Sequence, residues 1–176
     1  MQRPTPVDRE RHFGEDEIIV SKTDPAGKIT YANDVFCKIG AFTVEELIGK
    51  PHSILRHPDM PRAVFRLLWE RIKAGEEIFA YVKNLAKTGE YYWVFAHVTP
   101  SFGPGRQITG YHSNRRAPHR SALAQIEPIY RALLQEEARH ADRKAAVDAG
   151  YAMLMQHLAK AGVSYDEFVF SITPEN

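Results

Sequence analysis

The chain has 176 residues, enough for one ordinary domain with an appendage. Hydrophobic residues make up 44% and charged residues 26%, as in soluble globular proteins, and 23 basic against 22 acidic side chains leave a net charge of +1. This balance gives no sign of a nucleic-acid-binding surface. No apolar run reaches the ~18 residues of a membrane span, and the N-terminus has no signal-peptide core. Cys37 is the single cysteine, which excludes an intramolecular disulfide, so we expect a cytoplasmic location.

Residues 1–16 are polar and rich in proline and arginine, which predicts a flexible arm or a short cap. Two β-branched runs follow, Glu17–Lys22 and Lys28–Ala32. The turn sequence Asp24–Gly27 separates them, so we expect a β-hairpin.

The pattern then becomes helical. Thr43 and Glu46 have the spacing of a capping box, which marks the start of a helix. A longer helix is predicted over about Pro61–Ala74. Its apolar residues recur at i, i+3, i+4 and i+7 and form one stripe: Phe65, Leu68, Trp69 and Ile72.

Three further strands are predicted, at Ile78–Leu85, Tyr91–Pro100 and Gln107–Arg115. Short connections between them indicate antiparallel pairing. The fold class is therefore α+β, with a five-stranded antiparallel sheet and helices on one side, over residues 17–116.

Residues 117–176 are predicted to form a helical C-terminal extension without a catalytic pattern. One apolar stripe contains Pro128, which we expect to kink or restart its helix. A second stripe ends at Gly162, and Ser164 and Glu167 form another capping box. The two stripes comprise Leu123, Ile126, Tyr130, Leu133 and Leu134, and then Val147, Tyr151, Leu154 and Leu158.

The most specific stretch is RHPDMP, at Arg56–Pro61, followed by Phe65 and Trp69. It resembles the helical segment of PAS domains in the bacterial aerotaxis receptor family. Further segments resemble the same family, so that the likeness covers roughly residues 17–135: Ile29–Asp34, Val82–Asn84, Gly89–Val94 and Ile126–Tyr130.

This resemblance implies a PAS fold that binds FAD and reports redox state or oxygen to a signalling partner, such as a chemoreceptor or a kinase. The ligand residues of the family carry over to six positions: Asn33, His52, Arg56, His57, Asp59 and Asn84. The chain departs from the family pattern at one position. The family has a tryptophan, associated with the flavin, in the strand that begins here at Ile78-Phe79, and this strand has none.

The chemistry of a flavin adds further candidates. Phe65, Trp69 and Trp93 are large enough to line an apolar slot for the ring. The amide of Asn84 matches the mixed donors and acceptors of the pyrimidine edge. Structural roles compete with these assignments, because an aspartate such as Asp59 is a common helix cap and a tryptophan such as Trp69 is common in a core.

Other functions remain open at this point. Photoadduct chemistry of the light-oxygen-voltage type is rejected, because HSILRHPDMP contains no cysteine. A haem-binding gas sensor would need an axial histidine such as His57, His97 or His112. An interaction module without cofactor is the third possibility. We expect no enzyme, no nucleic-acid partner and no metal site, and a homodimer rather than a monomer.

Overall fold

The structure is a computed structural model that describes residues 4–174. The chain forms two compact units. The first, the sheet unit, comprises residues up to His57 together with Ile72–Ala117. The second, the helical unit, comprises Pro58–Arg71 together with the residues from Pro118 onward. Pro58–Arg71 thus groups with the C-terminal helices, although it lies before residue 117 in the sequence.

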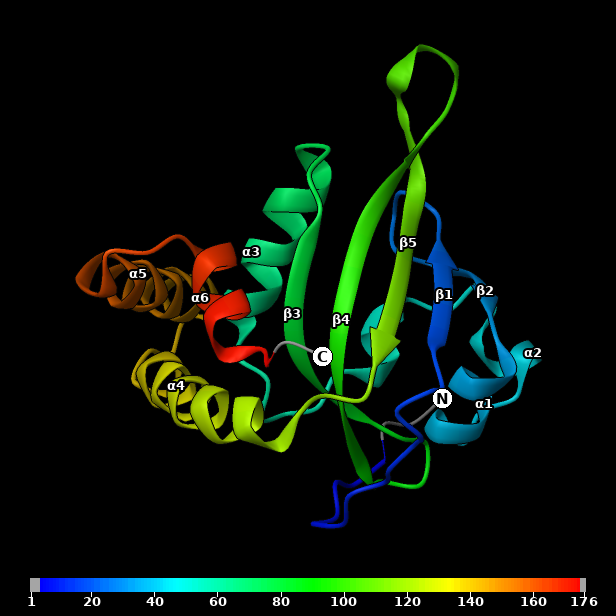
Figure 1. Cartoon of the computed structure of the whole chain (residues 1–176), viewed down its shortest axis with the longest axis horizontal. Helices are drawn as coiled ribbons and strands as arrows, with labels where there is room; N and C mark the ends of the chain where they lie inside the picture. Colours follow the sequence, from blue (N-terminus) through cyan, green and yellow to red (C-terminus); the bar gives the residue numbers. More distant parts are fainter. Residues whose placement is uncertain (1–3, 175–176) are drawn as a thin grey trace. The chain divides into compact units, whose positions relative to one another are not determined.

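The sheet unit contains the predicted five-stranded antiparallel sheet (Figure 1), which confirms the expected fold class. Its order is β2-β1-β5-β4-β3, so the first hairpin pairs with the last strand through β1 and β5. The strands are β1 (Ile19–Thr23), β2 (Ile29–Ala32), β3 (Ile78–Leu85), β4 (Tyr91–Phe102) and β5 (Ile108–Arg116).

Three short helical elements connect β2 to the RHPDMP segment: α1 (Asp34–Gly40), α2 (Val44–Leu47) and the 3-10 helix η1 (His52–Leu55). The predicted capping box is confirmed, since Thr43 and Glu46 exchange side-chain hydrogen bonds with each other's backbone amides at the start of α2. These caps satisfy amides that a helix of four residues leaves without internal partners.

The helical unit is built from the first part of α3 (Arg62–Lys73) and from three later helices: α4 (Arg120–Ala138), α5 (Arg143–Ala161) and α6 (Tyr165–Ile172). The predicted end at Gly162 and the predicted capping box before α6 are both confirmed. Pro128 lies inside a continuous α4, so the helix does not restart there.

Helix α3 buries a different set of side chains from the stripe that its spacing predicts. Ala63, Val64 and Leu67 are buried together with Ile72, whereas Phe65, Leu68 and Trp69 are half-buried. A period of 3.6 residues locates an apolar face, but small residues such as Ala63 decide where a neighbouring helix approaches most closely.

The start of α3 is capped from another helix. The buried carboxylate of Glu137 in α4 accepts hydrogen bonds from the backbone amides of Arg62 (3.1 Å) and Ala63 (2.9 Å). Gly150 of α5 makes room for it, because a Cβ there would lie 2.9 Å from Cγ and Oε1 of Glu137. A salt bridge between Arg66 of α3 and Asp148 of α5, at 2.6 Å, extends this contact.

The N-terminal arm is docked on the sheet unit over its described residues; residues 1–3 of the predicted arm lie outside them. Tyr91 lies on β4 beyond the last residue that β5 pairs with, so its backbone groups are available there. The amide of Tyr91 donates to the carbonyl of Arg9, and the amide of Arg11 donates to the carbonyl of Tyr91. The arm therefore acts as a cap, which is one of the two expected alternatives.

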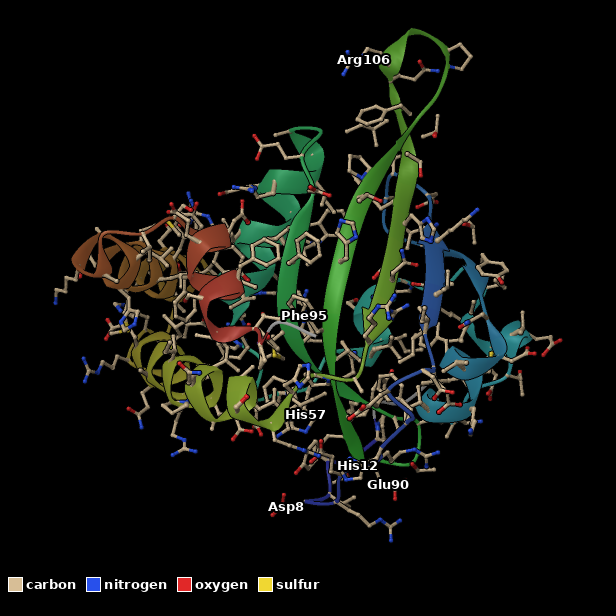
Figure 2. The ribbon with its side chains drawn as sticks, in the orientation of Figure 1. Asp8, His12, His57, Glu90, Phe95 and Arg106 are labelled. Atoms are coloured by element: carbon tan, nitrogen blue, oxygen red, sulfur yellow. The ribbon has the colours of Figure 1, made fainter. Side chains whose placement is uncertain are left out.

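Glu90 lies beside the N-terminal arm (Figure 2) and binds side chains of the arm. Its carboxylate binds Arg11 at 2.7 Å, Thr88 at 2.8 Å and the Nε of Arg9. Hydrogen bonds from Arg11, Thr88 and Arg9, in that order of effect, lower the pKa of Glu90 from 4.5 to about 2. The contribution of Glu90 to docking is therefore complete above pH 4.5 and is lost as the pH falls toward 2.

We expect the arm to detach in that pH range, and Glu90→Gln to detach it already at neutral pH. The measurement is NMR of the Arg11 backbone amide and of the Arg9 and Arg11 Nε–H signals. Glu77→Gln removes an exposed carboxylate of the same unit and serves as the control. Equal protection of the Arg11 amide in wild type and Glu90→Gln at pH 7 would contradict this assignment.

Candidate functional site

Side chains of a strand alternate between the two faces of a sheet, so the register decides which residues lie together. Asn84 of β3 is the cross-strand partner of Tyr92 in β4, and Arg115 of β5 is the partner of Ala96 in β4. These four side chains lie on one face, because Tyr92 and Ala96 are an even number of residues apart. Phe36 of α1 contacts Arg115 there. We call this face, with Asn84, Tyr92 and Arg115, the inner face.

Arg115 is the largest fully buried side chain of the structure, with 2% of its surface exposed. Its Nη2 donates to the hydroxyl of Ser21 at 2.5 Å, and its Nη1 lies 3.5 Å from Nε2 of His52. The guanidinium carbon lies 4.6 Å from the centre of the Phe36 ring. Burial lowers the pKa of Arg115 to about 10, so the side chain remains charged at neutral pH.

His52 of η1 completes this cluster as a neutral ring. Burial, followed by the nearby charges of Arg115 and Arg56, lowers the pKa of His52 to about 3. Nε2 lies within 3.3 Å of the Ser21 hydroxyl and faces the donor Nη1 of Arg115. Because a guanidinium can only donate, we assign Nε2 as the acceptor and place the proton of the ring on Nδ1.

The charge of Arg115 has no acidic partner in the described part of the chain. Its polar contacts are a hydroxyl and a neutral imidazole, and its Nε is buried without a hydrogen-bond partner. Buried arginines in folded proteins are ordinarily paired with carboxylates, because an uncompensated buried charge is costly. The described residues therefore supply no acidic acceptor for Arg115.

Asn84 and Tyr92 also carry polar side-chain groups on the inner face that make no hydrogen bond to a described residue. The side-chain amide of Asn84 is 5% exposed and makes no hydrogen bond to a described residue. The hydroxyl of Tyr92 is fully buried and also lacks a partner. Burial raises the pKa of Tyr92 to about 12 against the opposing effect of the Arg115 charge, so the phenol keeps its proton. An unpaired buried polar group costs about 1–3 kcal/mol, so the hydroxyl of Tyr92 and the Nε of Arg115 together on one face are unusual.

Three of the residues expected at the site meet around this face. Asn84 is on it, His52 touches Arg115, and Arg56 forms an isolated backbone bridge with Asn84. The charge of Arg56 also acts on the ring of His52. The RHPDMP segment thus begins directly beside Asn84 of β3.

Asn33 has a structural role in the structure. Its Oδ1 accepts from the amides of Val20 (2.9 Å) and Phe36 (3.1 Å), and its Nδ2 donates to the carbonyl of Ile18 (2.8 Å). The side chain therefore caps α1 and joins it to β1. This cap sets the position of Phe36 beneath Arg115.

His57 and Trp93 are directed away from the inner face. Trp93 is the cross-strand partner of Lys83 and is an odd number of residues from Tyr92, so it lies on the opposite, outer face. The buried ring of His57 meets Tyr91, which shares that outer face, edge to face at a centroid distance of 6.0 Å. Neither side chain is placed with Asn84 and Arg115.

The other three expected residues belong to the helical unit. Asp59 is exposed in a turn before α3, and Phe65 and Trp69 are half-buried on α3. The amides of Arg62 and Ala63, at the start of α3, bind Glu137.

Sequence reasoning missed Arg115, Tyr92 and Ser21. A signal for them existed in the alternation of β5, where Tyr111, Ser113 and Arg115 share one face. The long separation between Ser21 and Arg115 concealed the contact, since only the β1–β5 pairing brings them together.

Comparison with known proteins agrees with this fold. The family described as PAS fold matches residues 18–113. The chain belongs to the PAS family. The aerotaxis receptor of Escherichia coli is 41% identical over 69% of this chain, which confirms the resemblance of the sequence. The nitrogen fixation regulatory protein of Klebsiella pneumoniae is 25% identical over 56% of it. The chain spans 24% of the length of the first of these relatives and 20% of the second.

Solved PAS structures support the same fold. A light-oxygen-voltage domain studied with a flavin analogue has a TM-score of 0.55 and 17% identity, covering 63% of this chain and 84% of that one. The dark structure of the blue-light photoreceptor Aureochrome1 LOV has a TM-score of 0.53 and 21% identity, covering 69% and 84%. At these identities the likeness concerns the fold alone. Among the described residues, no helix is long and apolar enough to cross a membrane.

Proposed function

We propose that this PAS domain binds FAD at the inner face of its sheet and acts as a redox or oxygen sensor. The observation that carries the proposal is the convergence of three polar side chains of buried residues from three adjacent strands. These are Asn84, Tyr92 and Arg115, and the hydroxyl of Tyr92 and the Nε of Arg115 are buried without a hydrogen-bond partner among the described residues. A bound ligand with several polar atoms would satisfy all of them.

The three groups fit a flavin in chemical terms. The pyrimidine edge of the ring carries carbonyl acceptors and an N–H donor, which an asparagine amide complements because it both donates and accepts. Arg115 supplies donors and positive charge for a carbonyl or for developing negative charge. When bound, the flavin supplies reversible reduction. Asn84, Tyr92 and Arg115 would orient it, and Arg56 and His52 would border it.

The relatives support a signalling role. The aerotaxis receptor and the biofilm dispersion protein BdlA of Pseudomonas aeruginosa, which is 32% identical over 48% of this chain, are both named for behavioural responses. We propose that this chain passes its redox state to a signalling protein, such as a chemoreceptor or a kinase. We also propose that it works in the cytoplasm and as a homodimer.

The test is the absorption spectrum of the purified protein, followed by denaturation and identification of the released cofactor. We expect a yellow protein that releases about one FAD per chain, as expected for a single site. A colourless preparation that takes up no added FAD would refute the proposal. A Soret band would indicate haem, and no chromophore with intact folding would favour an interaction module.

A further inference from the structure

We propose that Arg115 makes the inner face select the more negatively charged form of its ligand, so that flavin binds more tightly when reduced. This inference rests on the proposed flavin binding. The resemblance of the RHPDMP segment to known receptors did not predict a role for Arg115.

Arg115 is an isolated cation among the described residues. Arg115 is 2% exposed, and its polar contacts, Ser21 and His52, are neutral. The ring face of Phe36 adds an electrostatic contact at 4.6 Å, which is far weaker than a carboxylate. No carboxylate of a described residue lies within salt-bridge distance of Arg115.

His52 and Tyr92, the titratable neighbours of Arg115, do not change their charge near neutral pH. His52 stays neutral because burial, and then the charges of Arg115 and Arg56, lower its pKa, and Tyr92 keeps its proton because burial raises its pKa. The positive charge therefore stays on the inner face until a ligand compensates it. In a site of low polarity such a charge acts strongly on whatever is bound beside it.

Reduction changes the charge of the proposed ligand. Two-electron reduction of a flavin with uptake of one proton adds one negative charge to the ring, the electrons coming here from dithionite as reductant. The oxidised ring offers Arg115 a neutral acceptor, whereas the reduced anion offers a charged one. Hydrogen bonds to charged groups exceed neutral ones in strength, so the reduced form gains more from Arg115.

The experiment measures dissociation constants of FAD in the oxidised and dithionite-reduced states. We expect Arg115→Met to lower the ratio of oxidised to reduced dissociation constants by about 10- to 100-fold, the range for one charged hydrogen bond. Arg115→Lys keeps the charge and should keep most of the ratio. Arg116→Met changes an adjacent, exposed arginine on the outer face and serves as the control.

A second variant keeps the test decisive if Arg115→Met does not fold. Ser113 lies on the inner face two residues before Arg115, opposite Ser21, so Ser113→Asp would supply the missing carboxylate. It should lower the ratio as Arg115→Met does. Unchanged ratios in both variants, with flavin still bound, would overturn the role of Arg115 and leave the proposed function intact. Failure of the wild type to bind flavin in either state would overturn both.

Discussion

Asn84→Ala is expected to weaken FAD binding by about 5- to 150-fold, the range for losing a hydrogen bond to a buried partner. The substitution should leave folding nearly unchanged, because the side chain makes no hydrogen bond to a described residue that would be lost. The protein without ligand should therefore be about as stable as the wild type. Fluorescence titration with FAD and chemical denaturation measure the two quantities.

Asn114→Ala is the matched control. Asn114 is exposed on β5 and is the partner of Val20 and His97, which places it on the outer face. We expect its FAD affinity to equal that of the wild type. Equal affinity of Asn84→Ala and Asn114→Ala would exclude Asn84 from the site.

Glu137→Ala is expected to lower the free energy of unfolding by about 1–3 kcal/mol. The reason is that two amides at the start of α3, those of Arg62 and Ala63, lose their acceptor. The negative charge also lies at the N-terminus of that helix, where it is favourable. Urea denaturation measures the change, and Glu137→Gln, which keeps one carbonyl acceptor, should lose less.

Glu136→Ala is the control for this prediction. Glu136 is the neighbouring carboxylate of α4, and it pairs with the exposed side chains of Arg139 and His140. Surface pairs of this kind contribute about 0–1 kcal/mol. If Glu137→Ala and Glu136→Ala were equally stable, the capping contact from α4 to α3 would carry no stability.

Local signals in the sequence accounted for much of the fold. The hairpin of β1 and β2 follows from its turn residues, and the capping boxes at Thr43 and Ser164 follow from the spacing of complementary side chains. These features depend on residues a few positions apart, so the sequence contains all that decides them. The same holds for the end of α5 at Gly162, where a positive φ of 69° suits glycine.

The candidate site was predicted less completely, because its decisive contacts are distant in sequence. The alternation of side chains along β4 places Trp93 and Tyr92 on opposite faces of the sheet. Only the β1–β5 pairing and the contact of Phe36 with Arg115 show which of these faces α1 and η1 cover. Asn33 was expected at the ligand and is instead occupied by three backbone groups. The cap from Glu137 to α3 joins residues 74 positions apart, beyond any local pattern.

In the proposed site, neutral and charged side chains of the inner face would hold the ligand together. Asn84 and Tyr92 are neutral and Arg115 is charged, so the site combines shape-directed hydrogen bonds with one fixed charge. A ligand can shift a conformational equilibrium only through the difference in its interaction with the two states. Arg115 would provide such a difference, since its interaction would change with the charge of the proposed ligand.

The most direct test of this account is NMR of labelled protein with and without FAD, following the Asn84 side-chain amide and the Nε–H of Arg115. We expect both signals to shift and to become protected from exchange with water when FAD binds, while the side-chain amide of Asn114 stays unchanged. If FAD binds and the Asn84 and Arg115 signals do not move, the ligand lies elsewhere and the inner-face site is wrong.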